Sequence, residues 1–384
     1  VMFKKSAVAA LAVLVITGSF CLLAGGCGKK TESGRYKIGV IVSLSGPGAP
    51  LGQSEQKSIN LLKDQLEKDG GINGQPVEFL VEDDESDPAK ASVAANKLIE
   101  QEKVPVLIGC STTGSTLAVV PIAEKAGIPL VSMAAGTQVT QPVKKFVFSV
   151  APSDALVIRK TMMYFKDVMK INKLAILHDA NAYGTGGADQ VKAMAPRYGI
   201  NIVASESYGS ADTDMTAQLT KIQQTPAQAV LVWGTNPGPA SIAKNMQQLG
   251  MKIPFIGSSG IANKTFINLA GGAANGVIFP ASRLILPNTI PAGSEWARVV
   301  KAFGADYKKT HNADIDTFAA HGWDAGNIVI SAFRDAGDDS ALVRDHIEKT
   351  KDYPGADGVF TYKPKDHAGL DVDALVMVRI ENGQ

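Results

Sequence analysis

Short apolar runs alternate with helical segments along most of this chain, and this order of elements constrains the fold more than any other feature. A strand, a helix and a second strand in that order predict a parallel sheet with helices on both faces, joined by right-handed crossovers. In the first part of the chain the predicted strands are at 37–42, 77–81, 104–109 and 130–132, and the predicted helices are at 52–68, 88–102 and 114–125. The fold class that we expect is therefore α/β.

The same order of elements begins again after residue 152 and predicts a second α/β sheet. Its predicted helices are at 153–169, 184–198, 213–224 and 238–249, and its predicted strands are at 173–178, 201–205, 229–233, 253–256 and 276–279. The remaining predicted elements are helices at 295–309, 317–336 and 342–350 and strand-like runs at 358–362 and 374–380. We expect the late helices to cover the first sheet and the last strands to join the second.

The length of the chain supports two lobes, because 384 residues are more than one hydrophobic core usually supports. Open parallel sheets bind ligands at the carboxyl ends of their strands. Two such sheets placed edge to edge therefore share one cleft. A cleft that closes by bending at a few crossing strands is suited to the capture of a small molecule.

The N-terminal segment predicts export from the cytoplasm. Lys4 and Lys5 precede an apolar run at 7–23, and the small residues Ala24-Gly25-Gly26 precede Cys27. This pattern resembles a lipoprotein signal, which is cleaved just before a cysteine that then carries acyl chains. It predicts a signal peptide at 1–26, lipidation at Cys27 and a tether at 27–35. The expected location is periplasmic and lipid-anchored, or the extracytoplasmic face of the cell membrane; ordinary secretion and an uncleaved anchor are the alternatives.

Charge, cysteine content and histidine spacing argue against nucleic-acid binding, an intramolecular disulfide and a metal site. The formal net charge is +1, and loss of the two signal lysines leaves about −1, so no basic field exists to attract nucleic acid. Cys21 leaves with the signal and Cys27 is the lipidation candidate, which leaves Cys110 without an intramolecular disulfide partner. The histidines show no metal-ligand spacing. We expect no metal, no cofactor and a monomer.

Two hydroxyl-rich turns predict a site for a carboxylate. Thr112 and Thr113 follow an apolar strand and begin a helix, where unpaired N–H groups and a partial positive charge favour an anion. The turn at 132–137, with Ala134, Ala135 and Thr137, follows the next strand and lets a ligand approach the backbone. Ordinary helix capping and a tight loop without a ligand are the alternative interpretations.

A third turn, at 178–184, lies at a strand end of the second predicted lobe. Tyr183 in this turn offers a ring and a hydroxyl to a ligand. The adjacent His178 and Asp179 also permit a hydrolase interpretation, but no serine or cysteine nucleophile motif accompanies them.

In this order and spacing, several stretches resemble the branched-chain amino acid-type periplasmic substrate-binding proteins of ABC transporters, which are leucine/isoleucine/valine-binding proteins with the type I periplasmic binding fold. The resemblance covers 36–380. The matching stretches are Lys37-Ile38-Gly39-Val40, Ser45-Gly46-Pro47, Gly70-Gly71-Ile72-Asn73-Gly74, Asp83-Asp84, Asp87-Pro88, 109–118, His178-Asp179, Tyr183-Gly184, 257–263 and Trp323-Asp324-Ala325.

The resemblance implies two Rossmann-like lobes with parallel sheets, joined by three crossing strands near Val150, Phe279 and Val359, and no catalytic activity. It implies a first lobe at 36–150 plus 281–356 and a second lobe at 151–280 plus 357–384. It also implies an ABC permease in the inner membrane as the partner and membrane association through the lipid anchor only.

The resemblance also implies a set of ligand-binding residues. Thr113 corresponds to the carboxylate-binding serine of the family, Tyr183 to its second-lobe tyrosine and Phe318 to its aromatic wall. The full implied set is Thr112, Thr113, Ala134, Ala135, Thr137, Tyr183, Thr235, Ser259 and Phe318. The chain departs from the family where Ser86 and Thr112 occupy the positions of its disulfide and where Thr235 stands in place of a tyrosine.

The departure at Ser259 bears on the ligand, because the family has an acidic residue there that pairs with the ammonium group of the substrate. An ammonium group without its counter-charge in a closed cleft loses on the order of 3 to 5 kcal/mol, against a total of about 8 kcal/mol for micromolar binding. The sequence therefore favours a carboxylate without an α-ammonium group, either an aromatic or a short aliphatic acid. A branched-chain or other amino acid is the alternative, with an acidic residue from elsewhere in the chain.

The leading class is thus a solute-binding lipoprotein of an ABC importer that closes on its ligand by a hinge motion. A secreted hydrolase is a distant alternative that rests on His178 and Asp179. A sensory ectodomain is the other distant alternative, and it usually continues into a membrane helix and a signalling domain that this sequence does not include.

Overall fold

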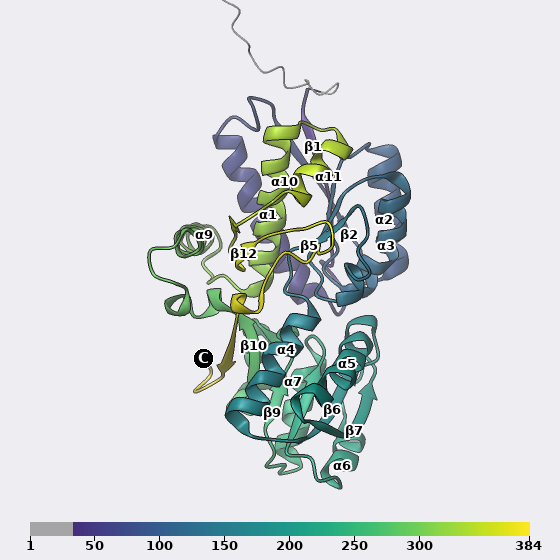
Figure 1. The fold of residues 1–384 in the computed structure, drawn as a ribbon, viewed down its shortest axis with the longest axis vertical. Helices are drawn as coiled ribbons and strands as arrows, with labels where there is room; N and C mark the ends of the chain where they lie inside the picture. The colour runs from purple at the N-terminus through teal and green to yellow at the C-terminus, as the bar shows by residue number, and fades with distance from the viewer. Residues whose placement is uncertain (1–33) are drawn as a thin grey trace, which may run out of the picture.

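The structure is a computed structural model that describes residues 34–384, so the predicted signal peptide and the lipidation at Cys27 lie outside the described residues. The chain forms two lobes, one above the other in Figure 1. The strands of the first lobe are β1 (Tyr36–Val42), β2 (Val77–Asp83), β3 (Leu107–Gly109), β4 (Leu130–Ser132) and β5 (Val147–Ser149). They form a parallel sheet in the order β2-β1-β3-β4-β5.

The second lobe contains a six-stranded sheet in the order β13-β10-β9-β8-β6-β7. Its strands are β6 (Lys173–Asp179), β7 (Asn201–Tyr208), β8 (Ala229–Trp233), β9 (Phe255–Gly257), β10 (Ile278–Ser282) and β13 (Leu375–Arg379). All neighbours are parallel except β13, which pairs antiparallel with β10. The predicted α/β fold with two parallel sheets is confirmed.

Helices cover both faces of each sheet. In the first lobe α1 (Ala49–Lys68), α10 (Thr317–Ala336) and α11 (Ser340–Glu348) pack on one face, and α2 (Pro88–Asn96) and α3 (Thr113–Ala126) on the other. In the second lobe α4 (Asp154–Tyr164) and α5 (Ala182–Met194) lie on one face, and α6 (Thr216–Gln223), α7 (Gly238–Gln248) and α8 (Lys264–Ala270) on the other. The remaining helix, α9 (Glu295–His311), packs beside α1.

The alternation of buried side chains along β1 explains why the sheet needs two helical layers. Ile38 and Val40 belong to the core shared with α1 and α10, whereas Ile41 packs in the core with α2 and α3. Successive side chains of a strand point to opposite faces of the sheet, so a strand that is apolar at nearly every position must be covered on both sides.

The chain passes between the lobes three times: after β5, after β10 and before β13. We expected the third crossing near Val359 and the whole of 357–384 in the second lobe. Instead, Phe360, Tyr362 and Leu370 pack in the core of the first lobe. The short strand β12 (Val359–Phe360) pairs with β11 (Tyr353–Pro354) in a separate two-stranded sheet. The predicted boundary was therefore wrong for the residues before β13.

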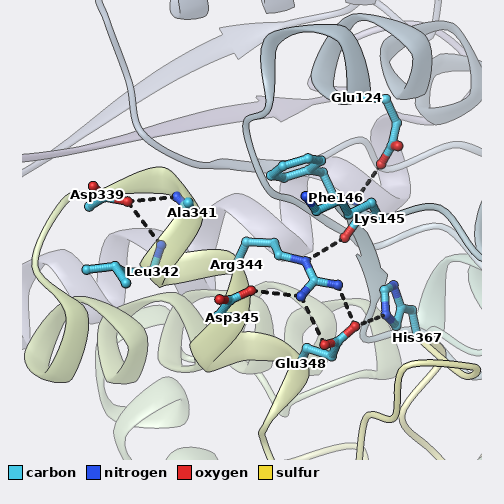
Figure 2. Close-up of polar contacts among 10 residues, drawn as sticks. All are labelled: Glu124, Lys145, Phe146, Asp339, Ala341, Leu342, Arg344, Asp345, Glu348 and His367. Atoms are coloured by element: carbon cyan, nitrogen blue, oxygen red, sulfur yellow. Dashed lines mark hydrogen bonds and ion pairs between the residues drawn. The ribbon is translucent and has the colours of Figure 1, made fainter.

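A polar network around Arg344 explains why this late segment stays on the first lobe (Figure 2). The Arg344 guanidinium donates to the carbonyl of Lys145 at 2.8 Å and to the carboxylate of Glu348. Glu348 also lies 3.1 Å from His367 Nε2, and the His367 ring stacks on Phe148 of β5 at 4.2 Å. The hydrogen bonds from Arg344 hold the pKa of Glu348 below its usual range. The network thereby joins the segment before β13 to the first sheet.

Candidate functional site

The N-terminus of α3 lies at the carboxyl end of β3, as the sequence predicts. Thr112 is its N-cap, and Thr112 Oγ1 accepts a hydrogen bond of 3.3 Å from the N–H of Ser115. The N–H groups of Thr113 and Gly114 precede the first intrahelical bond and have no partner in the helix. Together with the helix dipole, these groups give this end of α3 a partial positive charge that suits a carboxylate.

The N-terminus of α5, in the second lobe, lies opposite that of α3. Its N-cap is Asn181, whose Oδ1 accepts a hydrogen bond of 2.9 Å from the N–H of Gly184. A β-carbon placed on Gly114 would lie 3.9 Å from the β-carbon of Ala182, so the two helix ends almost touch. Figure 1 shows α3 and α5 on the same side of the molecule, one in each lobe. Two positive helix ends therefore converge on the space between the lobes.

A cleft of about 320 Å³ lies at this place, near the lower end of the range for small-molecule sites. Most of the residues that line it are small or carry hydroxyl groups. They are Pro47, Gly48, Leu51, Ser86, Pro88, Ser111, Thr112, Thr113, Gly114, Met133, Ala135, Pro152, Asn181, Ala182, Tyr183, Ser210, Thr235, Ser259, Gly260, Ser282, Thr317, Phe318, His321 and Leu375. Burial lowers the pKa of His321 to about 3, so the lining carries no formal charge at pH 7.

Seven of the nine predicted ligand-binding residues line this cleft: Thr112, Thr113, Ala135, Tyr183, Thr235, Ser259 and Phe318. They come from both lobes and from elements far apart in the sequence. The Tyr183 hydroxyl is buried and makes no hydrogen bond within the described residues. Burial raises the pKa of Tyr183, and the nearby Asp154 raises it further, so the hydroxyl stays protonated and can donate to a ligand. The binding role of these residues remains a prediction.

The structure does not bring Ala134 and Thr137 into the lining of the cleft. The N–H of Ala134 donates to Ser132 Oγ at 3.1 Å, so this group is already bonded within its own loop. Thr137 Oγ1 accepts a hydrogen bond from the N–H of Ala155 at 3.0 Å and donates to Gln190 Oε1 at 3.2 Å. Ala155 and Gln190 belong to α4 and α5, so Thr137 joins the two lobes instead of facing the cleft.

Other contacts also join the lobes around the cleft. The N–H of Asp154 donates to the carbonyl of Ala135 at 2.8 Å, and Gln138 Nε2 donates to the carbonyl of Ala182 at 3.2 Å. Near α8, Lys264 Nζ lies 2.8 Å from Asp314 Oδ2 of the first lobe. The hydrogen bonds from Lys264 and Lys308 hold the pKa of Asp314 at about 2, so the acid is ionised at neutral pH. These contacts stabilise the arrangement in which the lobes face each other.

Buried carboxyl groups behind the wall of the cleft were not predicted. Glu55 accepts a hydrogen bond from Ser111 Oγ, and burial raises the pKa of Glu55 to about 8. Both oxygens of Asp154, close to Tyr183, are buried and make no hydrogen bond within the described chain, and burial raises the pKa of Asp154 as well. The burial of Glu55 could have been predicted from the sequence. Glu55 lies four residues after Leu51 and four before Ile59, which places it on the apolar face of α1.

Replacing Thr113 with valine is expected to weaken the binding of a carboxylate ligand by about 10- to 100-fold, because a hydrogen bond to a charged group contributes about 1.5–3 kcal/mol. Valine has nearly the shape of threonine, so packing against Gly136 is kept. Titration calorimetry measures the loss. Thr220→Val, on α6 in the second lobe, is the control that should bind normally. Equal affinity of the Thr113 variant and the wild type would remove Thr113 from the site.

Comparison with known proteins identifies the class of this protein. A family model described as "Periplasmic binding protein" matches residues 35–384. Because that match covers far more than half of the chain, the chain belongs to this family. The predicted type I periplasmic binding fold is confirmed by the same match and by the solved structures that resemble it.

The particular relatives include proteins named for branched-chain amino acids and a receptor named only for ligand binding. A Leu/Ile/Val-binding protein homolog from Brucella melitensis is 28% identical over 328 residues, which cover 85% of this chain and 86% of the relative. An extracellular ligand-binding receptor from Rhodopseudomonas palustris is 32% identical, with a TM-score of 0.85 and coverage of 91% of this chain and 98% of the other. The branched-chain amino acid transporter substrate-binding protein LivJ from Streptococcus pneumoniae, solved with isoleucine, is 28% identical, with a TM-score of 0.81 and coverage of 91% and 97%.

The resemblance predicted from the sequence is thereby confirmed: the protein is a periplasmic substrate-binding protein of the branched-chain amino acid type. The relatives are binding proteins. His178 Nδ1 contacts the backbone carbonyl of Asp179 at 2.8 Å, while the Asp179 carboxylate accepts a hydrogen bond from Ser210. Within residues 34–384 no helix has the length and apolar character needed to cross a membrane.

Proposed function

We propose that the protein captures an α-amino acid in the cleft between its lobes and delivers it to an ABC permease. The names of the relatives support this class of ligand: one is a homolog of Leu/Ile/Val-binding proteins, one is a leucine-, isoleucine-, valine-, threonine- and alanine-binding protein, and one was solved with isoleucine. The observation that carries the proposal is the convergence of the N-termini of α3 and α5 on an uncharged cleft. There the α-carboxylate would accept hydrogen bonds from the free N–H groups of α3 and from Thr113.

A carboxylate without an α-ammonium group is the second candidate ligand. The sequence favours it because Ser259 replaces the acidic residue of the family. The cleft offers a further reason, because none of the described residues that line it is acidic. The relatives favour the amino acid instead. Asp154, which is buried near Tyr183 and has no hydrogen-bonding partner among the described residues, is a candidate for the acid from elsewhere in the chain, although it does not itself line the cleft.

Pairs of ligands that differ only in the ammonium group test the proposal. Leucine pairs with 4-methylpentanoate, and phenylalanine pairs with 3-phenylpropanoate. Titration calorimetry on ligand-free protein is expected to show that at least one amino acid binds about tenfold or more tightly than its paired acid, a difference of about 1.4 kcal/mol. Tighter binding of the acids would overturn the proposal in favour of the second candidate. Binding of neither kind would reject both.

The cellular setting of the proposal follows from the N-terminal sequence and the family. The relatives are extracytoplasmic binding proteins. We place this protein in the periplasm, or on the extracytoplasmic face of the cell membrane, as a monomer held by acyl chains on Cys27. Metabolic labelling with a fatty acid tests the anchor: the wild type should be labelled, and the Cys27→Ala variant should not.

A further inference from the structure

Buried polar side chains that have no hydrogen-bonding partner among the described residues gather at one edge of the cleft. Thr317 and His321, on successive turns of α10, both line the cleft and are 2% and 4% exposed. Thr317 Oγ1 and both ring nitrogens of His321 make no hydrogen bond within the described residues. His321 Nε2 lies 3.3 Å from Asp357 Oδ2, but the two groups are not aligned for a hydrogen bond.

This edge of the cleft lies beside the crossings between the lobes. Ser282 ends β10 and lines the cleft, and its hydroxyl donates to the carbonyl of Asp357 at 3.3 Å. Leu375, which begins β13, also lines the cleft. A ligand group at this edge would therefore contact the first lobe at α10 and the second lobe at the ends of two of its strands.

The chemistry of this edge defines the kind of group that fits it. Buried polar atoms are nearly always hydrogen-bonded, and an unsatisfied one is costly. Because Thr317 and His321 line the cleft, a ligand can supply the missing partner. A neutral imidazole and a hydroxyl both accept and donate hydrogen bonds, and neither Thr317 nor His321 carries a charge at pH 7, because burial lowers the pKa of His321.

We propose that Thr317 and His321 form a polar subsite that binds a hydroxyl or carboxamide group on the side chain of the ligand. The inference rests on the proposed function and makes it more specific. Phe318, between these two residues in sequence, packs its ring 5.7 Å from that of His321 and supplies an apolar surface beside the polar edge. The favoured ligand is thus a small amino acid whose side chain combines an apolar part with one neutral polar group.

Pairs of amino acids that are similar in shape test this subsite: valine with threonine, leucine with asparagine, and phenylalanine with tyrosine. Titration calorimetry on the wild type is expected to show about tenfold tighter binding of the polar member in at least one pair. In the Thr317→Val and His321→Leu variants, the polar and the apolar member of that pair should bind with affinities that differ by no more than about twofold. The His321→Gln variant, which keeps a hydrogen-bonding group, should retain part of the preference for the polar member. Thr220→Val is the matched control and should keep the full preference.

The outcomes separate this inference from the function on which it rests. Binding of the apolar members with no preference for the polar ones would overturn the subsite and leave the proposed function intact. A preference that persists in both Thr317→Val and His321→Leu would assign it to other residues and also overturn the subsite. If no amino acid binds, the proposed function fails, and 3-phenylpropanoate with 3-(4-hydroxyphenyl)propanoate then tests the subsite in the same variants.

Discussion

Replacing Glu55 with glutamine is expected to increase the free energy of unfolding at pH 8 by several kcal/mol while changing it little at pH 4. The carboxyl group is buried, and among residues 34–384 its Oε2 has one partner, the Ser111 hydroxyl, whereas its Oε1 has none. Burial raises the pKa of Glu55 from 4.5 to about 8, and the negative charges of Asp84 and Asp316 add to the shift. Glutamine has nearly the same shape and remains neutral at every pH.

The sign of the effect follows from proton linkage. Between about pH 4.5 and pH 8 the folded protein keeps the Glu55 proton while the unfolded chain has lost it, so the folded state binds more protons. The stabilisation by this group is complete below pH 4.5 and is lost as the pH rises toward 8. The glutamine variant has no such titrating group. The difference in the free energy of unfolding between the variant and the wild type therefore grows as the pH rises from 4.5 to 8.

Urea denaturation of ligand-free protein at pH 4, 6 and 8 measures the effect. Glu67→Gln, an exposed position on the same helix α1 that pairs weakly with Lys63, is the matched control and should follow the wild type at each pH. Parallel curves for the Glu55 variant and the wild type across this range would show that Glu55 is ionised in the folded protein at neutral pH.

Replacing Gly322 with alanine is expected to destabilise the protein by about 1–3 kcal/mol, because it overpacks the contact between α10 and α1. A β-carbon at Gly322 would lie 2.5 Å from the backbone carbonyl oxygen of Glu55 and 2.9 Å from its α-carbon. Backbone atoms inside a helix cannot rotate away as a side chain can. The two helices would therefore have to separate, and the core beneath them would lose contacts.

Gly304→Ala in α9 is the matched control for this substitution. There the nearest atom to the new β-carbon is the end of Ile315 at 3.5 Å, an ordinary contact. Alanine forms helices better than glycine, so this control should gain about 0.5–1 kcal/mol. Urea denaturation of both variants compares them. A stabilising effect of Gly322→Ala would show that α1 and α10 are not in close contact.

Much of the fold could be predicted because local pattern and topology agree. Buried β-strands such as Ala229–Trp233 are apolar at every position, and right-handed crossovers then determine how they assemble. The path of 357–370 could not be predicted in this way. The pattern at Phe360 and Tyr362 is typical of an ordinary strand. The segment stays on the first lobe because Arg344 and His367 bond to the backbone of Lys145 and Val147, about 200 residues earlier in the chain.

The candidate site was predictable where a motif lies at the end of a strand, as Thr112, Thr113 and Tyr183 do. Thr137 lies in such a turn too, but its hydroxyl bonds to residues of the other lobe, which only the packing of α4 and α5 reveals. His321 was missed because a histidine within an apolar helix gives no sign of whether it faces a cleft or the core.

The repeated passage of the chain between the lobes also determines the order in which they can fold during synthesis. Five of the six strands of the second sheet lie within the continuous stretch 173–282, so most of that lobe is available early. The first lobe needs α10 and α11 to cover β1, and these helices emerge roughly 250 residues or more after that strand. We therefore expect one face of the first sheet to stay exposed during synthesis until α10 and α11 have left the ribosome.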